Sequence, residues 1–549
     1  MVDPASAKRV ETPVLIVGCG PSGMTMALAL SGFGIKSVVI DRRQTISESP
    51  RAHALNCRTL EIFAALGVDI QALRSVATPD DESGWVRWVD TLCGGEYGSV
   101  PYERLNAPES VPTPYPLFNI AQPAAEEVLH GHVLQDANIR VERGWEWLDC
   151  EETDGAILST VSDSQGEPVV IESEYLVAAD GANSAVRVKH GIAMDGPGVT
   201  QQFKNVHFRA DLSALVEHKP AILYWILKQE CAGTLIAYDI RDNWTFMYPV
   251  DPAIEDPAAL SDEVCLQRAR EAIGSDDIEV ELLSVRDWEM TCEVASSYRS
   301  GRVFLVGDAA HRYPPSGGLG LNTGVGDAHN LAWKMAGNLQ GWAPEDLLDS
   351  YDRERRPVAN NNANFSLENA LKMMDLFGIA GIFAEAGTQP SLSELRGDPA
   401  QWDALQASIA DQRVHFDGLA LHIGAHYGRS EAPDPLDPQV QWPQVGARLP
   451  HVWVNRQGAR ISSHELISAT RFTLLVGPGV DADSLGIPVP HAVAACPEDF
   501  EADGESLRAL GLDGASVLVR PDGHIAALLS ASGEFDAAVE QTMKTGIAA

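Results

Sequence analysis

The sequence predicts an α/β fold: a Rossmann-like domain, an antiparallel sheet inserted into that domain, and a smaller domain at the C-terminus. Three observations lead to this prediction. A strand, a glycine-rich turn, a helix and a second strand follow one another from Thr12. Strand-like segments fill most of 200–300, and a proline-rich stretch precedes the last part of the chain. We therefore divide the 549 residues into a Rossmann-like domain (1–195, completed by 301–430), an inserted sheet (196–300), a linker (431–446) and a C-terminal domain (447–549).

The Rossmann-like domain begins with the motif GCGPSG, which lies between the apolar strand VLIV and a helical segment. Glycines at Gly18, Gly20 and Gly23 allow a tight turn, a close approach of a pyrophosphate to the backbone, and close packing of the helix on the strand. Asp41 ends the next strand, 18 residues after Gly23, where a carboxylate can bind ribose hydroxyls. These features predict dinucleotide binding, and a tight turn without a ligand is the alternative.

Two further glycine motifs follow strands later in the chain. Asp180 and Gly181 end one hydrophobic strand, and Gly307 and Asp308 end another. The loop after Asp308 is rich in glycine and proline, and it leads into a helix that we expect to begin near Asn322. A helix N-terminus offers free N–H groups and a partial positive charge, and glycine lets a ligand approach the backbone. We therefore expect the backbone there to come close to a ligand.

Strand patterns support the inserted sheet and the C-terminal domain. The segments NVHFRADL, AILYWILK, TLIAYDI, NWTFMYPV and IEVELLSV look like alternating strands separated by turn residues. In the C-terminal domain, RFTLLVGPG and ASVLVRPDGHIAALL predict strands, and PDG within the second segment predicts a hairpin turn.

The composition excludes several classes of function. The chain is 45% hydrophobic and 21% charged, without an apolar run that approaches the ~18 residues of a membrane span. We expect no secretion signal, because no basic flank precedes an apolar core at the N-terminus. The net charge of −37 disfavours nucleic acid and anionic membranes as partners. The eight cysteines contain no C-x-x-C pair, which argues against a zinc site and fits a reducing cytoplasm.

Several segments carry a family resemblance when they are taken together: GCGPSG, PRAHALNCRTLEIF, ADGANSAVR, GRVFLVGDAAH and PPSGGLGLNTGVGDAHNLAWK. This set resembles the FAD-dependent class A aromatic hydroxylases, in particular the phenol and dichlorophenol monooxygenase branch of the p-hydroxybenzoate hydroxylase family. The resemblance covers about 5–430. The tail segments GARLPHVWV and VLVRPDGHIAA resemble the thioredoxin-like C-terminal domain of that branch. Without a C-x-x-C pair this domain is expected to be structural, with a homo-oligomer contact as one option.

The resemblance implies FAD as the prosthetic group and assigns its contacts by position. The implied FAD contacts are Gly18, Gly20, Ser22 and Gly23 for the pyrophosphate, Asp41 with Arg42 nearby for the adenosine ribose, Arg51 and Gln122 for the phosphates and ribityl chain, Asp180 and Gly181 for both FAD and nicotinamide, Asp308 for the ribityl hydroxyls, and Gly318, Leu321 and Asn322 for the isoalloxazine.

The resemblance also implies the reaction. NADH or NADPH reduces the flavin, O2 adds at C4a, and the hydroperoxide transfers OH to an electron-rich aromatic ring. The chain has no second strand-linked glycine motif, so we expect the nicotinamide cofactor to dock transiently. The expected partners are a small aromatic substrate and O2, in the cytoplasm. Two alternatives stay open: epoxidation or ring oxygenation of a polyketide or alkaloid on the same fold, and a non-catalytic FAD-binding protein.

The substrate site is the least determined part of the prediction. A phenol is more nucleophilic once deprotonated, so a base within hydrogen-bond reach is expected. Our candidate base is His53, because related phenol-type enzymes often carry histidine there; a loop histidine bonded to backbone is the alternative. His311 is expected to be structural. The candidates for lining the pocket, each with packing as the alternative, are Tyr224, Tyr238, Arg241 and Trp244.

Overall fold

The computed structural model describes residues 8–46, 53–429, 431, 442–480, 489–529 and 541–546. Arg51, one of the expected FAD contacts, lies outside these ranges, as does most of the predicted linker. Among the described residues, no helix combines the length and the apolar character that crossing a bilayer requires.

The Rossmann-like domain is built on an eight-stranded sheet with the order β16-β17-β10-β1-β2-β7, to which β9 and β8 are added beside β10. Its strands are β1 (Lys8–Val17), β2 (Ser37–Asp41), β7 (Ile139–Arg143), β8 (Glu146–Glu152), β9 (Ile157–Ser162), β10 (Pro168–Ala178), β16 (Arg299–Ser300) and β17 (Val303–Leu305). The strands β2, β1, β10 and β17 run parallel to one another. Their carboxyl ends therefore share one edge of the sheet, and the three glycine motifs all lie at that edge.

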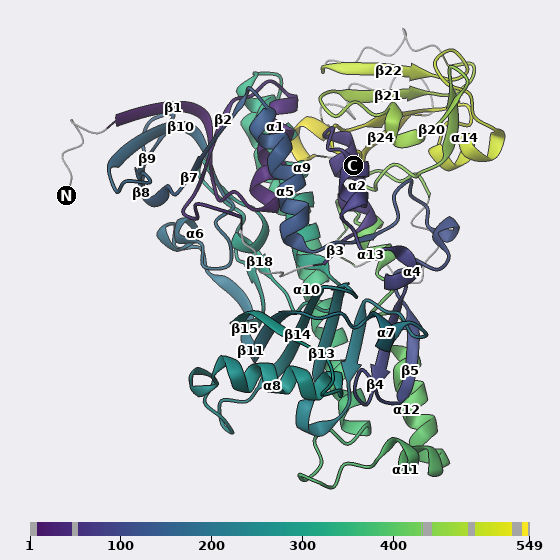
Figure 1. Cartoon of the computed structure of the whole chain (residues 1–549). Helices are drawn as coiled ribbons and strands as arrows, with labels where there is room; N and C mark the ends of the chain where they lie inside the picture. Colours follow the sequence, from purple (N-terminus) through teal and green to yellow (C-terminus); the bar gives the residue numbers. More distant parts are fainter. Residues whose placement is uncertain are drawn as a thin grey trace.

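Helices cover this sheet and connect it to the rest of the chain (Figure 1). The longest are α9 (Leu319–Leu339) and α10 (Ser350–Ile379). The shorter ones are α1 (Pro21–Gly32), α2 (Cys57–Ala65), α3 (Ile70–Ser75), α4 (Asp80–Ser83), α5 (Gln122–Gln135), α6 (Ala185–Lys189), α7 (Ser213–Val216), α8 (Asp262–Ile273), α11 (Leu392–Gly397), α12 (Pro399–Asp411), α13 (Leu419–Ile423) and α14 (Gly504–Leu510). Helix α9 begins at Leu319, three residues before the predicted start, because Gly318 caps it in a left-handed conformation with φ of +62°.

The second sheet also has eight strands, in the order β18-β15-β11-β14-β13-β12-β4-β5. The strands are β4 (Trp85–Val89), β5 (Glu96–Pro101), β11 (Met194–Arg209), β12 (Leu223–Ile226), β13 (Gly233–Asp239), β14 (Asn243–Val250), β15 (Glu281–Ala295) and β18 (His311–Arg312). It therefore extends beyond the predicted insertion at both ends. Its pairs are antiparallel except for β12 with β4, which are parallel. One face packs on α8, and the inner face packs on α10 and α12 (Figure 1).

The C-terminal domain holds a four-stranded sheet with the order β22-β21-β23-β24. Its strands are β21 (Phe472–Val476), β22 (His491–Ala495), β23 (Ser516–Val519) and β24 (Ile525–Leu529), beside the hairpin β19 (Trp453–Arg456) and β20 (Ala459–Ser462). Strand β21 is parallel to β22 and antiparallel to β23, which is the arrangement of the expected thioredoxin-like fold. Strands β23 and β24 form the predicted hairpin around PDG. A separate two-stranded ladder joins β3 (Ala54–Leu55) to β6 (Phe118–Asn119).

Candidate active site

Two of the three glycines of the first motif, Gly18 and Gly23, lie where neighbouring backbone leaves no room for a side chain. A Cβ on Gly18 would be 2.1 Å from the carbonyl oxygen of Ala179, and a Cβ on Gly23 would be 2.0 Å from the carbonyl oxygen of Gly18. Gly18 also has a φ of +109°, which L-residues rarely adopt. Gly20 differs, because a Cβ there would meet nothing within 4 Å. The turn is thus closed toward the protein and open on one side at Gly20.

Ser22 joins the first motif to the third. Its Oγ would be 2.4 Å from a Cβ on Gly307 and 2.3 Å from a Cβ on Gly324, so both glycines are needed for this approach. Because Gly18 abuts Ala179, which precedes Asp180, three segments that are far apart in sequence meet at one place. We call this arrangement the FAD cradle: residues 18–23, 179–181 and 307–324.

Asp41 lies beside the cradle at the end of β2 and is almost fully buried. Its Oδ2 accepts a hydrogen bond from the Cys19 backbone N–H at 3.0 Å, and its Oδ1 accepts one from the Arg43 N–H at 2.8 Å. Burial raises the pKa of Asp41, but the hydrogen bonds and charge of Arg43 outweigh it and hold the pKa below the ordinary value. The low pKa favours the ionised carboxylate, and its role in binding ribose hydroxyls stays a prediction.

The arginine that pairs with Asp41 is Arg43, and the predicted contact of Arg42 with FAD stays a prediction. The Arg43 guanidinium forms an ion pair with Asp41 at 3.2 Å, whereas the Arg42 side chain is exposed. Residues two apart in extended chain point to the same side, which is the signal that identifies Arg43. Gln122 opens helix α5, where its Nε2 donates to Glu126 at 2.6 Å.

The second motif contains a buried carboxylate oxygen with room beside it. Asp180 Oδ2 accepts from the Val186 N–H at 3.3 Å, while its Oδ1 is buried without a hydrogen-bond partner among the described residues. Burial raises the pKa of Asp180. Gly181 has a φ of +85° and open space around it. Asp308 is exposed directly after the buried strand β17. The open glycine next to the unpartnered Asp180 oxygen fits a ligand with hydroxyl groups, such as the ribityl chain of FAD.

The N-terminus of α9 forms the other end of the cradle. Gly320 faces open space, and a Cβ on Gly318 would already be 3.1 Å from the Ala54 side chain. Leu321 is half-buried against the main core. The Asn322 Oδ1 accepts from the Asn56 N–H at 3.0 Å and from the Thr59 hydroxyl at 2.7 Å, and its Nδ2 donates to the Ala54 carbonyl at 2.9 Å. The side chain of Asn322 thus ties α9 to β3 and α2, which leaves backbone to face a flavin.

His53 directly precedes β3, next to this end of the cradle. Its Nδ1 lies 3.1 Å from Asn119 Oδ1, an arrangement in which Nδ1 carries the proton and Nε2 of the neutral ring is the acceptor. Burial lowers the pKa of His53, which favours the neutral ring. The rings of Tyr102 and Tyr238 have their centres 6.2 and 6.3 Å from that of His53. Tyr102 and Asn119 were not predicted, because they lie in segments without a regular pattern.

Of the four pocket residues predicted on the inserted sheet, the structure brings only Tyr238 to His53. Tyr224 and Trp244 are fully buried in the core between the sheet and α8, where their rings pack together at 6.1 Å. Arg241 is exposed and forms an ion pair with Glu82 at 2.9 Å. The prediction fails for these three because both faces of the sheet are apolar, so alternation does not tell which face meets the substrate.

His311 belongs to a buried network behind the cradle. Its Nε2 lies 2.7 Å from Asp327 Oδ2, and Arg355 Nε donates to Asp327 Oδ1 at 2.8 Å. The ring stacks on Tyr313 at 4.9 Å. Opposite charges hold the pKa of Asp327 below its ordinary value although burial raises it. This pairing supports the expected structural role for His311.

Comparison with known proteins now defines the class. A cradle of this kind is that of a flavoprotein, and the chain matches the FAD binding domain family over residues 11–366 and the aromatic-ring hydroxylase C-terminal family over residues 442–545. The 2,4-dichlorophenol 6-monooxygenase of Delftia acidovorans is 31% identical, over 94% of this chain and 95% of its own. The tetracenomycin A2 monooxygenase-dioxygenase of Streptomyces glaucescens is 29% identical, over 97% of both chains.

A solved structure agrees with these relatives. The crystal structure of the flavin-dependent monooxygenase PieE in complex with FAD and substrate superposes with a TM-score of 0.90 at 30% identity, covering 98% of this chain and 100% of that one. The chain therefore belongs to the FAD-dependent aromatic-ring hydroxylase family. The predictions of fold class, family and FAD are confirmed, and the protein is a flavin-dependent enzyme.

Proposed function

We propose that this protein hydroxylates a phenolic or similar aromatic substrate, using O2 and either NADH or NADPH. The observation that carries the proposal is the position of His53 between the flavin end of the cradle and the inner face of the inserted sheet. A base at that place can meet an aromatic hydroxyl that faces the flavin. The family and the similarity to the dichlorophenol monooxygenase support the same reaction class.

Different parts of the chain have different roles in the proposed hydroxylation. Bound FAD supplies the activation of O2, which no side chain provides. With FAD bound, the free N–H groups at the N-terminus of α9 would stabilise negative charge on the flavin edge. His53 accepts the phenol proton at Nε2 and so makes the ring more nucleophilic. Burial raises the pKa of Tyr102 and of Tyr238, so both hydroxyls stay protonated and able to donate hydrogen bonds.

The test is a screen of phenols with the FAD-loaded enzyme. The expected result is NADH or NADPH oxidation that is stimulated by one phenol, with one atom from isotopically labelled O2 in the product. Oxidation without oxygenated product in every case would contradict the proposed reaction. A non-catalytic FAD-binding protein would give neither oxidation nor product.

A second candidate is the oxygenation of a larger, polyketide-like ring system. On the inner face of the inserted sheet, three buried polar atoms lack a partner among the described residues: Trp88 Nε1, Trp225 Nε1 and Asn205 Oδ1. They belong to one cross-strand row that runs from β4 through β12, β13 and β14 to β11. Four strand spacings of ~4.8 Å make that row longer than a single phenol ring.

The similarity to the tetracenomycin A2 monooxygenase-dioxygenase favours this second candidate as well. The same oxidation assay separates the two. A multi-ring aromatic that is oxygenated when simple phenols are not would select the polyketide class. Turnover of single-ring phenols with tight coupling would select the first.

A further inference from the structure

Two consecutive residues next to the proposed substrate site have a backbone conformation that L-residues rarely adopt. Glu103 has a φ of +48° and Arg104 a φ of +58°. They directly follow Tyr102, whose ring centre lies 6.2 Å from that of His53. Among the described residues other than glycine, only Gln457 in the turn between β19 and β20 also has a positive φ. Strain of this kind persists only where surrounding contacts hold it, and it is concentrated at functional sites.

The loop between α12 and α13 holds the strained turn through three consecutive residues. The Glu103 N–H donates to the Phe416 carbonyl at 2.7 Å, and the Gly418 N–H donates to the carboxyl oxygens of Glu103 at 3.2 Å. The Arg104 Nε donates to the Asp417 carboxylate at 2.8 and 3.0 Å. The loop therefore fixes both strained residues at once.

The Glu103 side chain is the buried part of this contact. Glu103 is 8% exposed, whereas the Arg104 side chain is 32% exposed. Burial raises the pKa of Glu103 to about 8, so its carboxyl group is mostly protonated at pH 7. A Cβ on Gly418 would lie 3.5 Å from Glu103 Oε1 and 2.8 Å from His422 Nε2, so these groups pack closely. Glu103 thus serves here as a neutral hydrogen-bonding group rather than as a charge.

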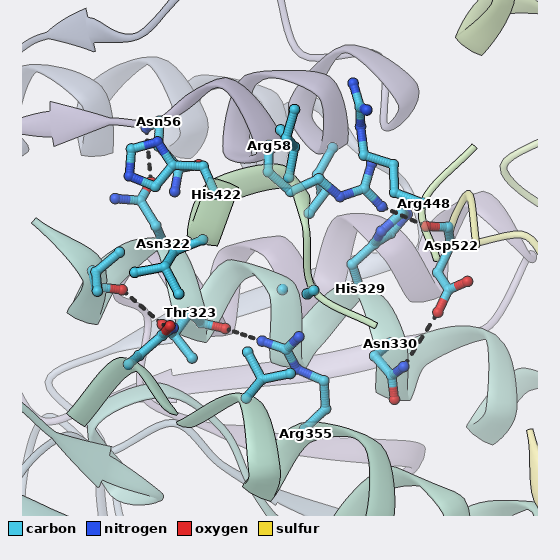
Figure 2. Close-up of a pocket in the computed structure, with 18 of the residues that line it drawn as sticks. Asn56, Arg58, Asn322, Thr323, His329, Asn330, Arg355, His422, Arg448 and Asp522 are labelled. Atoms are coloured by element: carbon cyan, nitrogen blue, oxygen red, sulfur yellow. Dashed lines mark hydrogen bonds between the residues drawn. The ribbon is translucent and has the colours of Figure 1, made fainter. Parts of the chain in front are cut away.

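Helix α13 continues from this loop and packs on the start of α2. Leu419 and Ile423 of α13 form an apolar cluster with Cys57, the first residue of α2. Figure 2 shows His422 of α13 and Asn56, the residue before α2, at the same end of a small cavity. We call residues 416–423, which contact both the strained turn and α2, the bridge.

The bridge connects the two sides of the proposed substrate site. His53 lies four residues before α2, separated from it by strand β3 and one further residue. Tyr102 lies directly before the strained turn. Because one end of the bridge holds the turn and the other packs on α2, it determines how the Tyr102 ring is placed relative to His53.

We propose that Glu103 is a positioning residue of the substrate site, which holds the Tyr102 ring at His53 through the bonds of its carboxyl group to Gly418. Without these bonds the turn relaxes out of the left-handed conformation and takes Tyr102 with it. Tyr102, and not Glu103, contacts the substrate. The inference therefore rests on the substrate site of the proposed hydroxylation.

The first test needs neither substrate nor turnover. It compares crystal structures of the FAD-loaded wild type, Glu103→Gln and Glu103→Leu. Glutamine keeps an oxygen that can accept from the Gly418 N–H, whereas leucine fills a similar volume without an acceptor. We expect Tyr102 to move away from His53 in Glu103→Leu and to stay in place in Glu103→Gln. An unmoved Tyr102 in both variants would overturn the proposal. Glu103→Ala replaces Glu103→Leu if the latter does not fold.

The second test is steady-state kinetics at pH 7 with the substrate found in the screen. We expect Glu103→Leu to raise KM by about 10-fold with kcat little changed, the effect of losing one hydrogen bond from Tyr102. Glu103→Gln should keep the wild-type KM, because it reproduces the neutral carboxyl group. Gln457→Gly is the control, since it relieves the same backbone strain in the C-terminal domain and should leave KM unchanged.

The two tests separate failure of this inference from failure of the proposed function. Equal KM values in Glu103→Leu and Glu103→Gln would overturn the positioning role, because the acceptor oxygen would then be irrelevant. A wild type that hydroxylates no phenol or larger aromatic would contradict the proposed function instead. In that case the position of Tyr102 in the crystal structures still decides whether Glu103 holds it at His53.

Discussion

The FAD cradle is made of backbone, whereas the inner face of the inserted sheet is made of side chains. In the cradle, a single methyl group at Gly18 or Gly23 would come within about 2 Å of a carbonyl oxygen. On the sheet, Tyr238 meets His53 across a ring separation of 6.3 Å. We therefore expect single substitutions in the cradle to abolish FAD binding. Substitutions on the sheet should instead change substrate preference gradually, through side-chain size and polarity.

The largest effect is expected from Gly18→Ala. The added Cβ meets the Ala179 carbonyl oxygen at 2.1 Å in a backbone conformation of φ +109°, so β1 and β10 must separate. We expect purified protein without FAD and a Tm lowered by about 5 °C or more, measured by flavin absorbance and circular dichroism. Gly397→Ala is the control, because a Cβ there meets nothing within 4 Å. A yellow Gly18→Ala protein of wild-type Tm would contradict a backbone-built cradle.

His53→Asn should slow hydroxylation by on the order of 10²-fold while FAD stays bound, because asparagine cannot take up the phenol proton. The measurement is kcat for product formation together with the flavin content. The exposed His218, changed to Asn, is the control and should leave kcat unchanged. A wild-type kcat in His53→Asn would show that His53 is not the base.

The pH dependence gives a related prediction. Burial lowers the pKa of His53 below 6.5, so the neutral, proton-accepting ring persists down to that lowered value. Rates should therefore stay above half of their maximum at pH 6.5 and fall to half only at more acid pH, for a substrate whose own ionisation lies outside that range. A profile that loses half of the rate above pH 6.5, and keeps this shape in His53→Asn, would assign the titration to another group.

Tyr238→Phe should have a smaller effect that is confined to the substrate. Removal of the hydroxyl costs one hydrogen bond, so we expect KM to rise by about 10-fold with kcat little changed. The measurement is steady-state kinetics on the substrate found in the screen. An unchanged KM would mean that Tyr238 packs against His53 without contacting the substrate.

Tyr224→Phe, on the opposite face of the same sheet, should have the smallest effect. Its hydroxyl donates to the Lys219 carbonyl at 2.9 Å, so its loss should lower the free energy of unfolding by about 1 kcal/mol. Urea denaturation measures this loss, and kcat and KM should stay at wild-type values. If Tyr224→Phe raised KM as much as Tyr238→Phe, the substrate would not be confined to the inner face of the inserted sheet.

The cradle could be predicted from the sequence because its geometry is local. The glycines, the strand ends and the helix start lie within short motifs, and the parallel order of β1, β10 and β17 brings those motifs to one edge. The differences there are small: Arg43, which was not predicted, pairs with Asp41, and α9 begins at Leu319.

The inner sheet face depends on distant pairings that no motif contains. Strand β4 joins β12 from more than a hundred residues away, and this pairing determines which side of the sheet is covered. Tyr224 and Trp244 look like pocket residues in sequence, but α8 buries them.

The central claim, that backbone openness at the cradle holds FAD, is tested most directly by titrating FAD into the apoprotein of the wild type and of Gly20→Ala. A Cβ on Gly20 meets nothing in the protein, so the variant should keep the wild-type Tm. It should nevertheless bind FAD at least ~10²-fold more weakly, because the methyl group takes the place of the pyrophosphate. Equal affinity of the two proteins, or a wild type that takes up no FAD, would contradict the account.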